Sequence, residues 1–129
     1  MRGVSLNGSK SNTPCHPMTE TIDYAAIADA ARDGYMNRVI STVNDHDVHI
    51  SVMDAPYRWH VHPNSDETFV AVEGTLVIEF EEDVVELRAG QLLTVPAGKP
   101  HCTRPGGART VNLTVEKKDA QTVFCDAPH

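Results

Sequence analysis

The sequence predicts an all-β protein of short antiparallel strands, folded as a sandwich or barrel, with one short helix near its N-terminus. From about residue 37 onwards the chain consists of short segments rich in Val, Ile and Thr, which are residues favoured in strands. Many of these segments alternate apolar with polar residues, as strands with one buried face do. Turn-forming Gly, Pro, Asn and Asp separate them at regular spacing, which is typical of antiparallel sandwiches and barrels.

The expected elements follow in chain order. Residues 1–18 contain few apolar side chains, so they are predicted to form a flexible tail. Residues 19–34 predict a short helix that Thr21 or Asp23 can cap and Gly34 can end. The apolar face of this helix is expected to consist of Ile22, Ala26, Ile27 and Ala30. Strands are then expected within residues 38–43, 47–53, 68–72, 75–80, 84–90, 91–95 and 109–115.

The length of 129 residues suits a single domain. We expect a leading helix and barrel over residues 19–118, and a C-terminal extension over residues 119–129 whose last residues are mobile. The 18 acidic and 11 basic residues give a net charge of -7, which argues against nucleic acid or an anionic membrane as a partner. No apolar segment resembles a signal peptide or a membrane span, so a cytoplasmic location is predicted. The three cysteines, Cys15, Cys102 and Cys125, are expected to be reduced.

The segment "WHVHPNSDET" places His60 and His62 two residues apart on an apparent strand. Side chains at this spacing project from the same side of a strand. Glu67 lies beyond the turn at Pro63 and Asn64, so its carboxylate can fold back beside the two imidazoles. Two nitrogens and one oxygen suit a divalent transition metal. The alternative is a pair of surface histidines, because short motifs often match by accident.

A second segment, "GQLLTVPAGKPH", runs from Gly90 to His101. Its strand ends at Pro96, Gly98 permits a tight turn, and His101 begins the returning strand. A third imidazole from this separate hairpin would complete a site of three histidines and one glutamate.

Together these segments resemble the two motifs of the cupin family, whose members fold as double-stranded β-helix barrels of the jelly-roll type. In the first motif His60, His62, Glu67 and Gly74 match, and Asp54 stands where a glycine is usual. In the second motif Gly90, Pro96, Gly98 and His101 match, and Pro105 stands where an asparagine is usual. Both departures concern turn geometry, so they put the local backbone shape in doubt more than the ligands. The motifs span residues 54–105, and the strand pattern extends the likeness to about residue 116.

The resemblance implies a cupin barrel in which His60, His62, Glu67 and His101 are metal ligands. Three neutral imidazoles and one carboxylate would leave a net charge of about +1 on a divalent ion, which would remain a Lewis acid. Iron, manganese, nickel, zinc and copper are all compatible with this ligand set. Small barrels of this family often pair through exposed strands, so the resemblance also implies a homodimer.

Other side chains have expected places around this site. Tyr57 is expected on the ligand side, either contacting the substrate or filling the barrel mouth, and Phe69 is expected to pack inward. Trp59 and Val61 should face away, and Asp66 and Cys102 should not be ligands. Arg104 and Arg109 are expected mainly at the surface, although either could hold a substrate anion. Further expectations concern Asn112, which could line the pocket, and His16, His46, His49 and His129, which lack partners at ligand spacing.

Two functions of different classes remain open. The first is a metalloenzyme for a small oxygenated molecule, such as a sugar derivative or a carboxylic acid, working as an isomerase or a dioxygenase. The spacing of its motif is similar to small cupins likened to mannose-6-phosphate isomerase, which is an analogy of fold. Its candidate catalytic residues are Glu67 and Tyr57. The second is a non-catalytic module that binds a small ligand.

Overall fold

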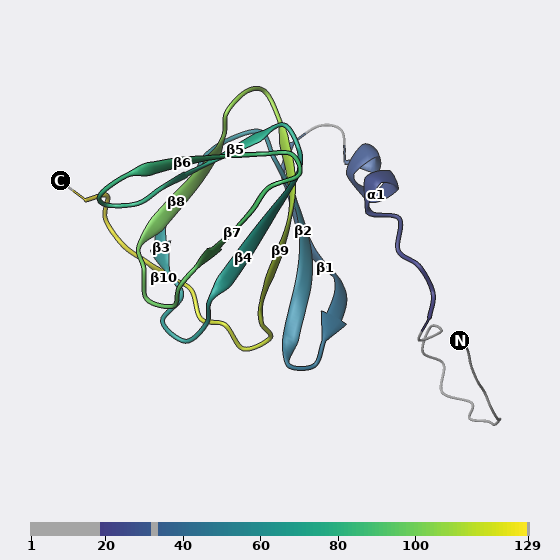
Figure 1. The fold of residues 1–129 in the computed structure, drawn as a ribbon, viewed down its shortest axis with the longest axis horizontal. Coiled ribbons are helices and arrows are strands. Elements are labelled where there is room, and N and C mark those ends of the chain that lie inside the picture. The colour runs from purple at the N-terminus through teal and green to yellow at the C-terminus, as the bar shows by residue number, and fades with distance from the viewer. Residues whose placement is uncertain (1–18, 32–33, 129) are drawn as a thin grey trace.

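Two five-stranded antiparallel sheets face each other and form the barrel of this computed structural model, which describes residues 19–31 and 34–128 (Figure 1). The first sheet has the order β1-β2-β9-β4-β7, and the second has the order β10-β3-β8-β5-β6. Neighbouring strands in each sheet are mostly far apart in sequence, as in a jelly roll. The predicted all-β double-stranded β-helix with one short helix is confirmed. The predicted tail, Cys15, His16 and His129 lie outside the described residues.

The bounds of the strands follow the expected segments closely. The first sheet consists of β1 (Met36–Val43), β2 (His46–Met53), β9 (Thr110–Lys117), β4 (Glu67–Glu73) and β7 (Leu92–Val95). The second sheet consists of β10 (Val123–Phe124), β3 (Tyr57–Val61), β8 (His101–Pro105), β5 (Thr75–Glu79) and β6 (Val84–Arg88). β3 and β8 are the strands that carry the two histidine-bearing segments.

The main hydrophobic core fills one part of the space between the sheets. It consists of Met53, Phe69, Ala71, Leu76, Ile78, Leu87 and Val95. In β4 the buried residues alternate with partly exposed ones, as expected of a strand with one inward face. Full burial of a Leu or Ile side chain stabilises a fold by roughly 1.5–3 kcal/mol, so this cluster supplies a rigid base beside the polar part of the barrel.

The helix α1 (Tyr24–Ala30) begins as predicted, because Asp23 Oδ1 accepts a hydrogen bond from Ala26 N at 3.0 Å. Its predicted end is wrong, and its predicted buried face is confirmed only at Ile27. The helix ends before Gly34, at a C-cap formed by Ala31. It packs on a second core cluster (Ile50, Val52 and Val111) through Ala28 and the partly buried Ile27 and Ala31. Of the predicted face, Ile27 is partly buried, whereas Ile22, Ala26 and Ala30 are exposed.

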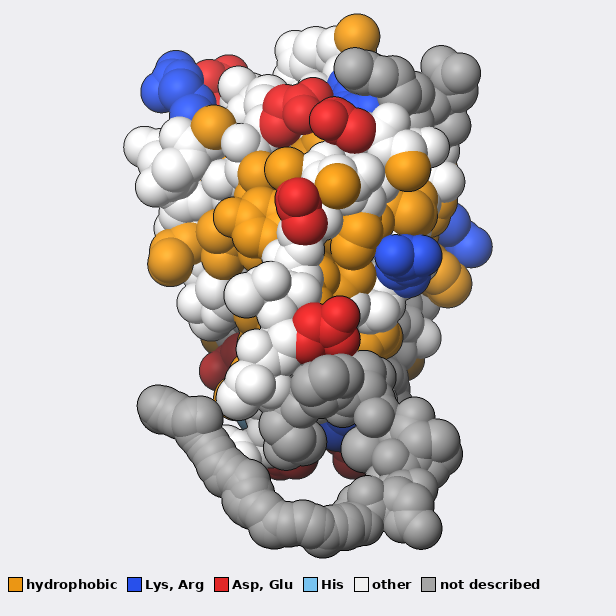
Figure 2. Space-filling model, turned by 90° about the vertical axis from the view of Figure 1, so that its right-hand side faces the viewer, with side chains coloured by type: hydrophobic (Ala, Val, Ile, Leu, Met, Phe, Trp, Pro, Cys, Tyr) orange, Lys and Arg blue, Asp and Glu red, His pale blue; other side chains and the backbone are white. Residues whose placement is uncertain are grey.

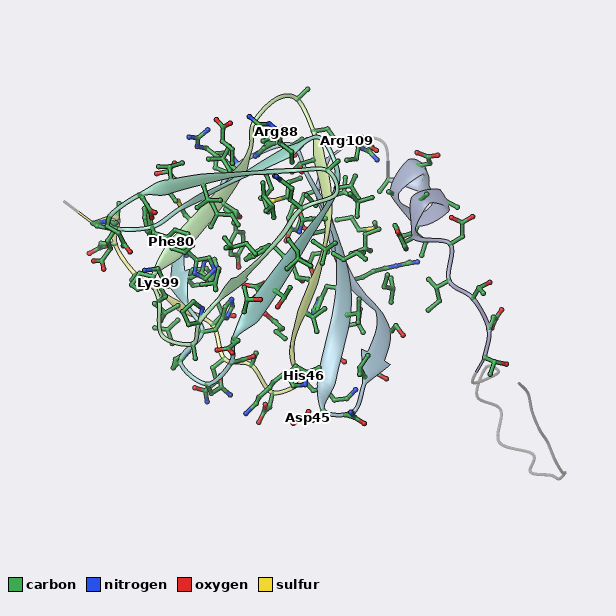
Figure 3. The ribbon with its side chains drawn as sticks, in the orientation of Figure 1. Asp45, His46, Phe80, Arg88, Lys99 and Arg109 are labelled. Carbon is green, nitrogen blue, oxygen red and sulfur yellow. The ribbon has the colours of Figure 1, made fainter. Side chains whose placement is uncertain are left out.

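Arg109 attaches this helix to the barrel. Its guanidinium donates hydrogen bonds to the carbonyl oxygens of Ala28 (2.8 Å) and Ala31 (3.3 Å) and pairs with Glu73 at 3.1 Å. A cation at a helix C-terminus satisfies carbonyl groups that have no partner within the helix. Arg109 lies between the barrel and α1 (Figure 3), so it has a structural role rather than the predicted surface or anion-binding one.

The expectation that the end of the chain is mobile is wrong for the described residues. Val123 and Phe124 form β10, which pairs with Val61 and His60 of β3. Cys125 N donates a hydrogen bond to Trp59 O at 3.1 Å, and the Arg58 guanidinium lies 4.0 Å from the centre of the Phe124 ring. The segment after β9 therefore adds β10 to the second sheet as the outer strand beside β3. Among the described residues, no helix has the length and apolar character needed to cross a membrane.

Candidate metal centre

Both sheets contribute to the candidate metal centre. His60 in β3 and His101 in β8 are directly paired across neighbouring strands of the second sheet. Glu67 is the first residue of β4 in the opposite sheet, and His62 follows the end of β3. The site therefore lies between the sheets, with imidazoles on one side and a carboxylate on the other.

The four predicted ligands converge as expected. One nitrogen of each histidine and one oxygen of Glu67 lie within 4.8 Å of one another, and all four residues are buried. Glu67 Oε1 is 3.0 Å from His62 Nε2 and 3.5 Å from His101 Nε2. The alternative of surface histidines on a strand is thereby excluded for His60, His62 and His101.

Backbone carbonyl groups fix the orientation of each imidazole. His60 Nδ1 is 2.7 Å from Arg58 O, His62 Nδ1 is 2.9 Å from Gln121 O, and His101 Nδ1 is 2.9 Å from Lys99 O. A carbonyl oxygen only accepts hydrogen bonds, so each Nδ1 must carry the proton. In a neutral imidazole this leaves Nε2 with its lone pair directed at the site, which is the arrangement found in metal-binding histidines.

The polar atoms at the centre fit a cation. His62 Nε2, His101 Nε2 and Glu67 Oε1 are buried and have no hydrogen-bond partner, although the contacts between them are short. Buried polar atoms without partners are costly and rare, and a metal ion would satisfy all three at once. Three nitrogens and one carboxylate suit a divalent transition metal, and they do not select one metal from this group.

Two hydrogen bonds join the turn after β3 to the turn that precedes His101. Gly98 N donates to His62 O at 2.9 Å, and Ala97 N donates to Asp66 Oδ1 at 2.9 Å. Asp66 thus faces away from the site, as predicted, and it binds the turn that precedes His101. The departures at Asp54 and Pro105 leave this arrangement intact. Asp54 has no positive φ, so a glycine is not needed there, and Pro105 pairs with Leu76 at the end of β8.

The comparisons with known proteins agree with this geometry. A family model described as "Cupin domain" matches residues 42–115, which include all four candidate ligands. This chain belongs to the cupin family. It is 42% identical over 110 residues to "Uncharacterized protein YdbB" of Bacillus subtilis (strain 168), covering 84% of this chain and 96% of that protein.

Solved cupin structures share the barrel. A cupin-2 domain containing protein from Shewanella frigidimarina is 26% identical, with a TM-score of 0.70 over 75% of this chain and 94% of that one. A Klebsiella pneumoniae protein with a double-stranded β-helix domain has a TM-score of 0.73 over 91% of this chain and all of that one, at 16% identity. The second likeness concerns the fold alone.

Burial and neighbouring charges shift the pKa values of three residues of this cupin site, His60, His62 and Glu67. Burial lowers the pKa of His60 to about 4. Burial also opposes a charged His62, but the Glu67 carboxylate outweighs it and raises the pKa of His62 to about 9. Burial by itself would raise the pKa of Glu67, whereas its contacts with His101 and His62 hold that pKa well below the usual range. Without metal, His62 therefore carries a proton near neutral pH that an ion must displace.

Three of the candidate ligands, His60, His62 and Glu67, border a cavity of about 330 Å³ between the sheets, which is within the size range of small-molecule pockets. Tyr57 lines it and packs edge-to-face against His60, with ring centres 5.1 Å apart. Strict alternation would put residues 57 and 60 on opposite faces, but the strand register shifts between them. This irregularity in β3 turns Tyr57 to the ligand side, as expected, and burial raises the pKa of its phenol.

Two titratable residues of this cavity, Glu116 and His49, were not placed at the site from the sequence. Glu116, near the end of β9, lines the cavity and lies 3.9 Å from His62 Nε2. Burial and the neighbouring Glu67 raise the pKa of Glu116 to about 7. His49 on β2 also lines the cavity, 3.9 Å from Glu116 and 3.0 Å from Asn37. Both residues belong to the alternate positions of β2 and β9 that face the cavity, and this alternation was the signal that could have placed them there. Neither residue has a histidine two positions away, as in the first cupin motif.

The other residues considered in the sequence either line the cavity or lie away from it. Asn112 and Phe69 line the cavity as expected, whereas Trp59, Val61 and Cys102 do not. The described cysteines Cys102 and Cys125 are free thiols. At the surface, Arg104 pairs with Glu79 at 2.9 Å and His46 pairs with Asp45 at 2.8 Å.

Proposed function

We propose that this cupin is a metalloenzyme that acts on a small oxygenated molecule, a sugar derivative or a carboxylic acid, by isomerase-type or oxygenase-type chemistry. The supporting observation is that a cluster of candidate metal ligands lies beside a cavity. The candidate metal ligands His60, His62, Glu67 and His101 are all buried, and backbone carbonyl groups orient the three imidazoles. His60, His62 and Glu67 also border a cavity that can hold a small molecule.

When bound, a divalent ion would supply a Lewis acid that polarises a substrate oxygen. The phenol of Tyr57 would donate a hydrogen bond to the bound molecule, because its raised pKa keeps it protonated near neutral pH. Glu116 presents a second carboxylate to the cavity, where an oxygen can accept a proton or a hydrogen bond. Glu67, the other catalytic candidate, is held between two imidazoles and is better placed as a ligand.

The test begins with elemental analysis of protein purified without added metal, followed by oxygen-uptake and carbonyl-isomerisation assays of the metal-loaded protein. We expect about one transition metal ion per chain and a strong loss of metal in His62→Ala, since removal of a ligand weakens binding. Equal metal content in the wild type and His62→Ala would refute the site. Ligand-dependent melting shifts without any product would instead favour a non-catalytic binding module.

A homodimer is part of the proposal. β1 is an unpaired edge of the first sheet, and its Val39 and Val43 are about half exposed (47% and 56%). Figure 2 shows apolar side chains gathered across the face on which β1 and α1 lie in Figure 1. Exposed apolar patches and free strand edges favour association. Light scattering during gel filtration should give a dimer, and Val39→Glu should shift it towards the monomer; a monomeric wild type would refute this part.

A further inference from the structure

The wall of the cavity opposite the second sheet has a chemical character of its own. Besides the metal ligands, the cavity is lined by hydroxyl groups, amides and one further carboxylate. The polar lining residues are Tyr35, Asn37, His49, Ser51, Tyr57, Thr103, Asn112, Thr114, Glu116 and Thr122. Half of them (His49, Ser51, Asn112, Thr114 and Glu116) come from β2 and β9, which run side by side in the first sheet. The cavity is thus built to form many hydrogen bonds.

Two acceptors in this wall have no hydrogen-bond partner among the described residues. Asn112 Oδ1 and Glu116 Oε1 are buried and accept no hydrogen bond, and Asn112 is only 1% exposed. A buried acceptor without a partner is costly. Both side chains line the cavity, so a ligand that brings hydrogen-bond donors would satisfy them.

Outside the candidate metal centre, the described lining offers no Lys or Arg charge to an anionic ligand. The nearby Lys99 lies over Phe80 and pairs with Glu82 at 2.7 Å, outside the lining (Figure 3). Proteins that bind carboxylate or phosphate groups usually supply Arg, Lys or helix N-termini. Here Glu116 would repel an anion that approached the metal ligands from the β9 side.

We propose that the cavity selects an uncharged polyhydroxylated molecule of about monosaccharide size, and that Glu116 is a specificity-determining residue that accepts a hydrogen bond from one of its hydroxyl groups. At roughly 30 Å³ per water, 330 Å³ holds about eleven water-sized groups, close to the size of a hexose. This inference rests on the proposed function and narrows its substrate from sugar derivatives and carboxylic acids to neutral polyols and sugars.

The experiment compares ligands that share one carbon skeleton and differ in charge. The panel consists of glycerol, erythritol, xylose, glucose, mannose and galactose, each with its sugar acid and its phosphate ester. Binding to metal-loaded wild type is measured by calorimetry and by thermal shift. At least one neutral compound should bind, and it should bind better than both of its anionic counterparts. Tighter binding of an anionic member, or no binding by any neutral one, would overturn the proposal.

A matched pair of variants tests the role of Glu116. Glu116→Gln keeps the shape and removes the charge, whereas Glu86→Gln makes the same change at an exposed position of β6. Loss of a hydrogen bond to a charged group should weaken the neutral ligand about tenfold or more in Glu116→Gln and reduce the preference against its anions. Glu86→Gln should match the wild type. Equal effects of the two variants would overturn the assignment.

Metal content separates the possible failures. If Glu116→Gln loses its metal while folding normally by circular dichroism, Glu116 is a ligand and the specificity role is overturned. If the wild type itself binds no metal, the proposed function fails. Preferential binding of a neutral compound by that metal-free protein would still support the cavity's selectivity.

Discussion

Removal of the C-terminal strand should weaken metal binding although no ligand is touched. In a chain ending at Ala120, His62 loses the Gln121 carbonyl that accepts from its Nδ1 at 2.9 Å, and the Thr122 hydroxyl that lies 3.3 Å from the same nitrogen. The imidazole is then free to rotate or to change its tautomer. β3 also loses its pairing with β10.

The size of the effect follows from these contacts. Loss of a group that orients a metal-binding histidine costs about 10- to 100-fold in metal affinity, or roughly 1.4–2.7 kcal/mol. The lost hydrogen bonds of β10 should lower stability as well, by about 1 kcal/mol each. The loss of metal affinity should therefore be larger than that caused by removing residues that contact neither His62 nor β3.

Competition with a chelator, using zinc or manganese as the probe, measures the affinity. The matched control ends at Cys125, which keeps Gln121, β10 and the hydrogen bond from Cys125 N to Trp59 O. This control should bind metal like the full chain, and circular dichroism should show both truncated chains folded. A folded chain ending at Ala120 with unchanged metal affinity would refute the idea that the C-terminal segment orients His62.

Three further outcomes are expected. Metal content should fall strongly in His101→Ala but stay near the wild-type value in His49→Ala; retained metal in the first would contradict the ligand set. Metal must displace a proton from His62, whose pKa is raised from 6.5 to about 9. Chelator competition should therefore show that metal affinity rises by up to about tenfold per pH unit between pH 6.5 and about 9. The metal-free protein should behave oppositely: the contribution of His62 to stability is full below pH 6.5 and lost as the pH rises through about 9, and a flat pH profile would contradict this. In thermal unfolding, Gly74→Ala should lower the free energy of unfolding by at least about 2 kcal/mol, and Gly90→Ala by about 1 kcal/mol. Both glycines have positive φ, but only at Gly74 would a Cβ lie 2.5 Å from a carbonyl oxygen. Equal losses of stability in the two variants would argue against that clash.

Much of the fold was predictable because local patterns carry it. β-branched residues at alternating positions indicated the strands of the first sheet, and Asn44 and Gly74 adopt the positive φ expected at turns. The helix was found with its cap, but of its predicted buried face only Ile27 packs against the barrel. Periodicity shows which residues of a helix can be buried, whereas the barrel surface beneath α1 decided that Ala28 is. The strand β10 was missed because two residues, Val123 and Phe124, are too few for a pattern.

The sequence by itself indicated the four candidate ligands, because His60, His62 and Glu67 lie close together in the chain and the segment ending at His101 matches the second cupin motif. Only the tertiary structure decided what surrounds those ligands. Glu116 and the Gln121 carbonyl approach His62 from more than 50 residues away in the chain, and Tyr57 turns inward through a local irregularity of β3. Such contacts depend on which strands become neighbours when the two sheets close on each other. Local periodicity carries no information about that pairing.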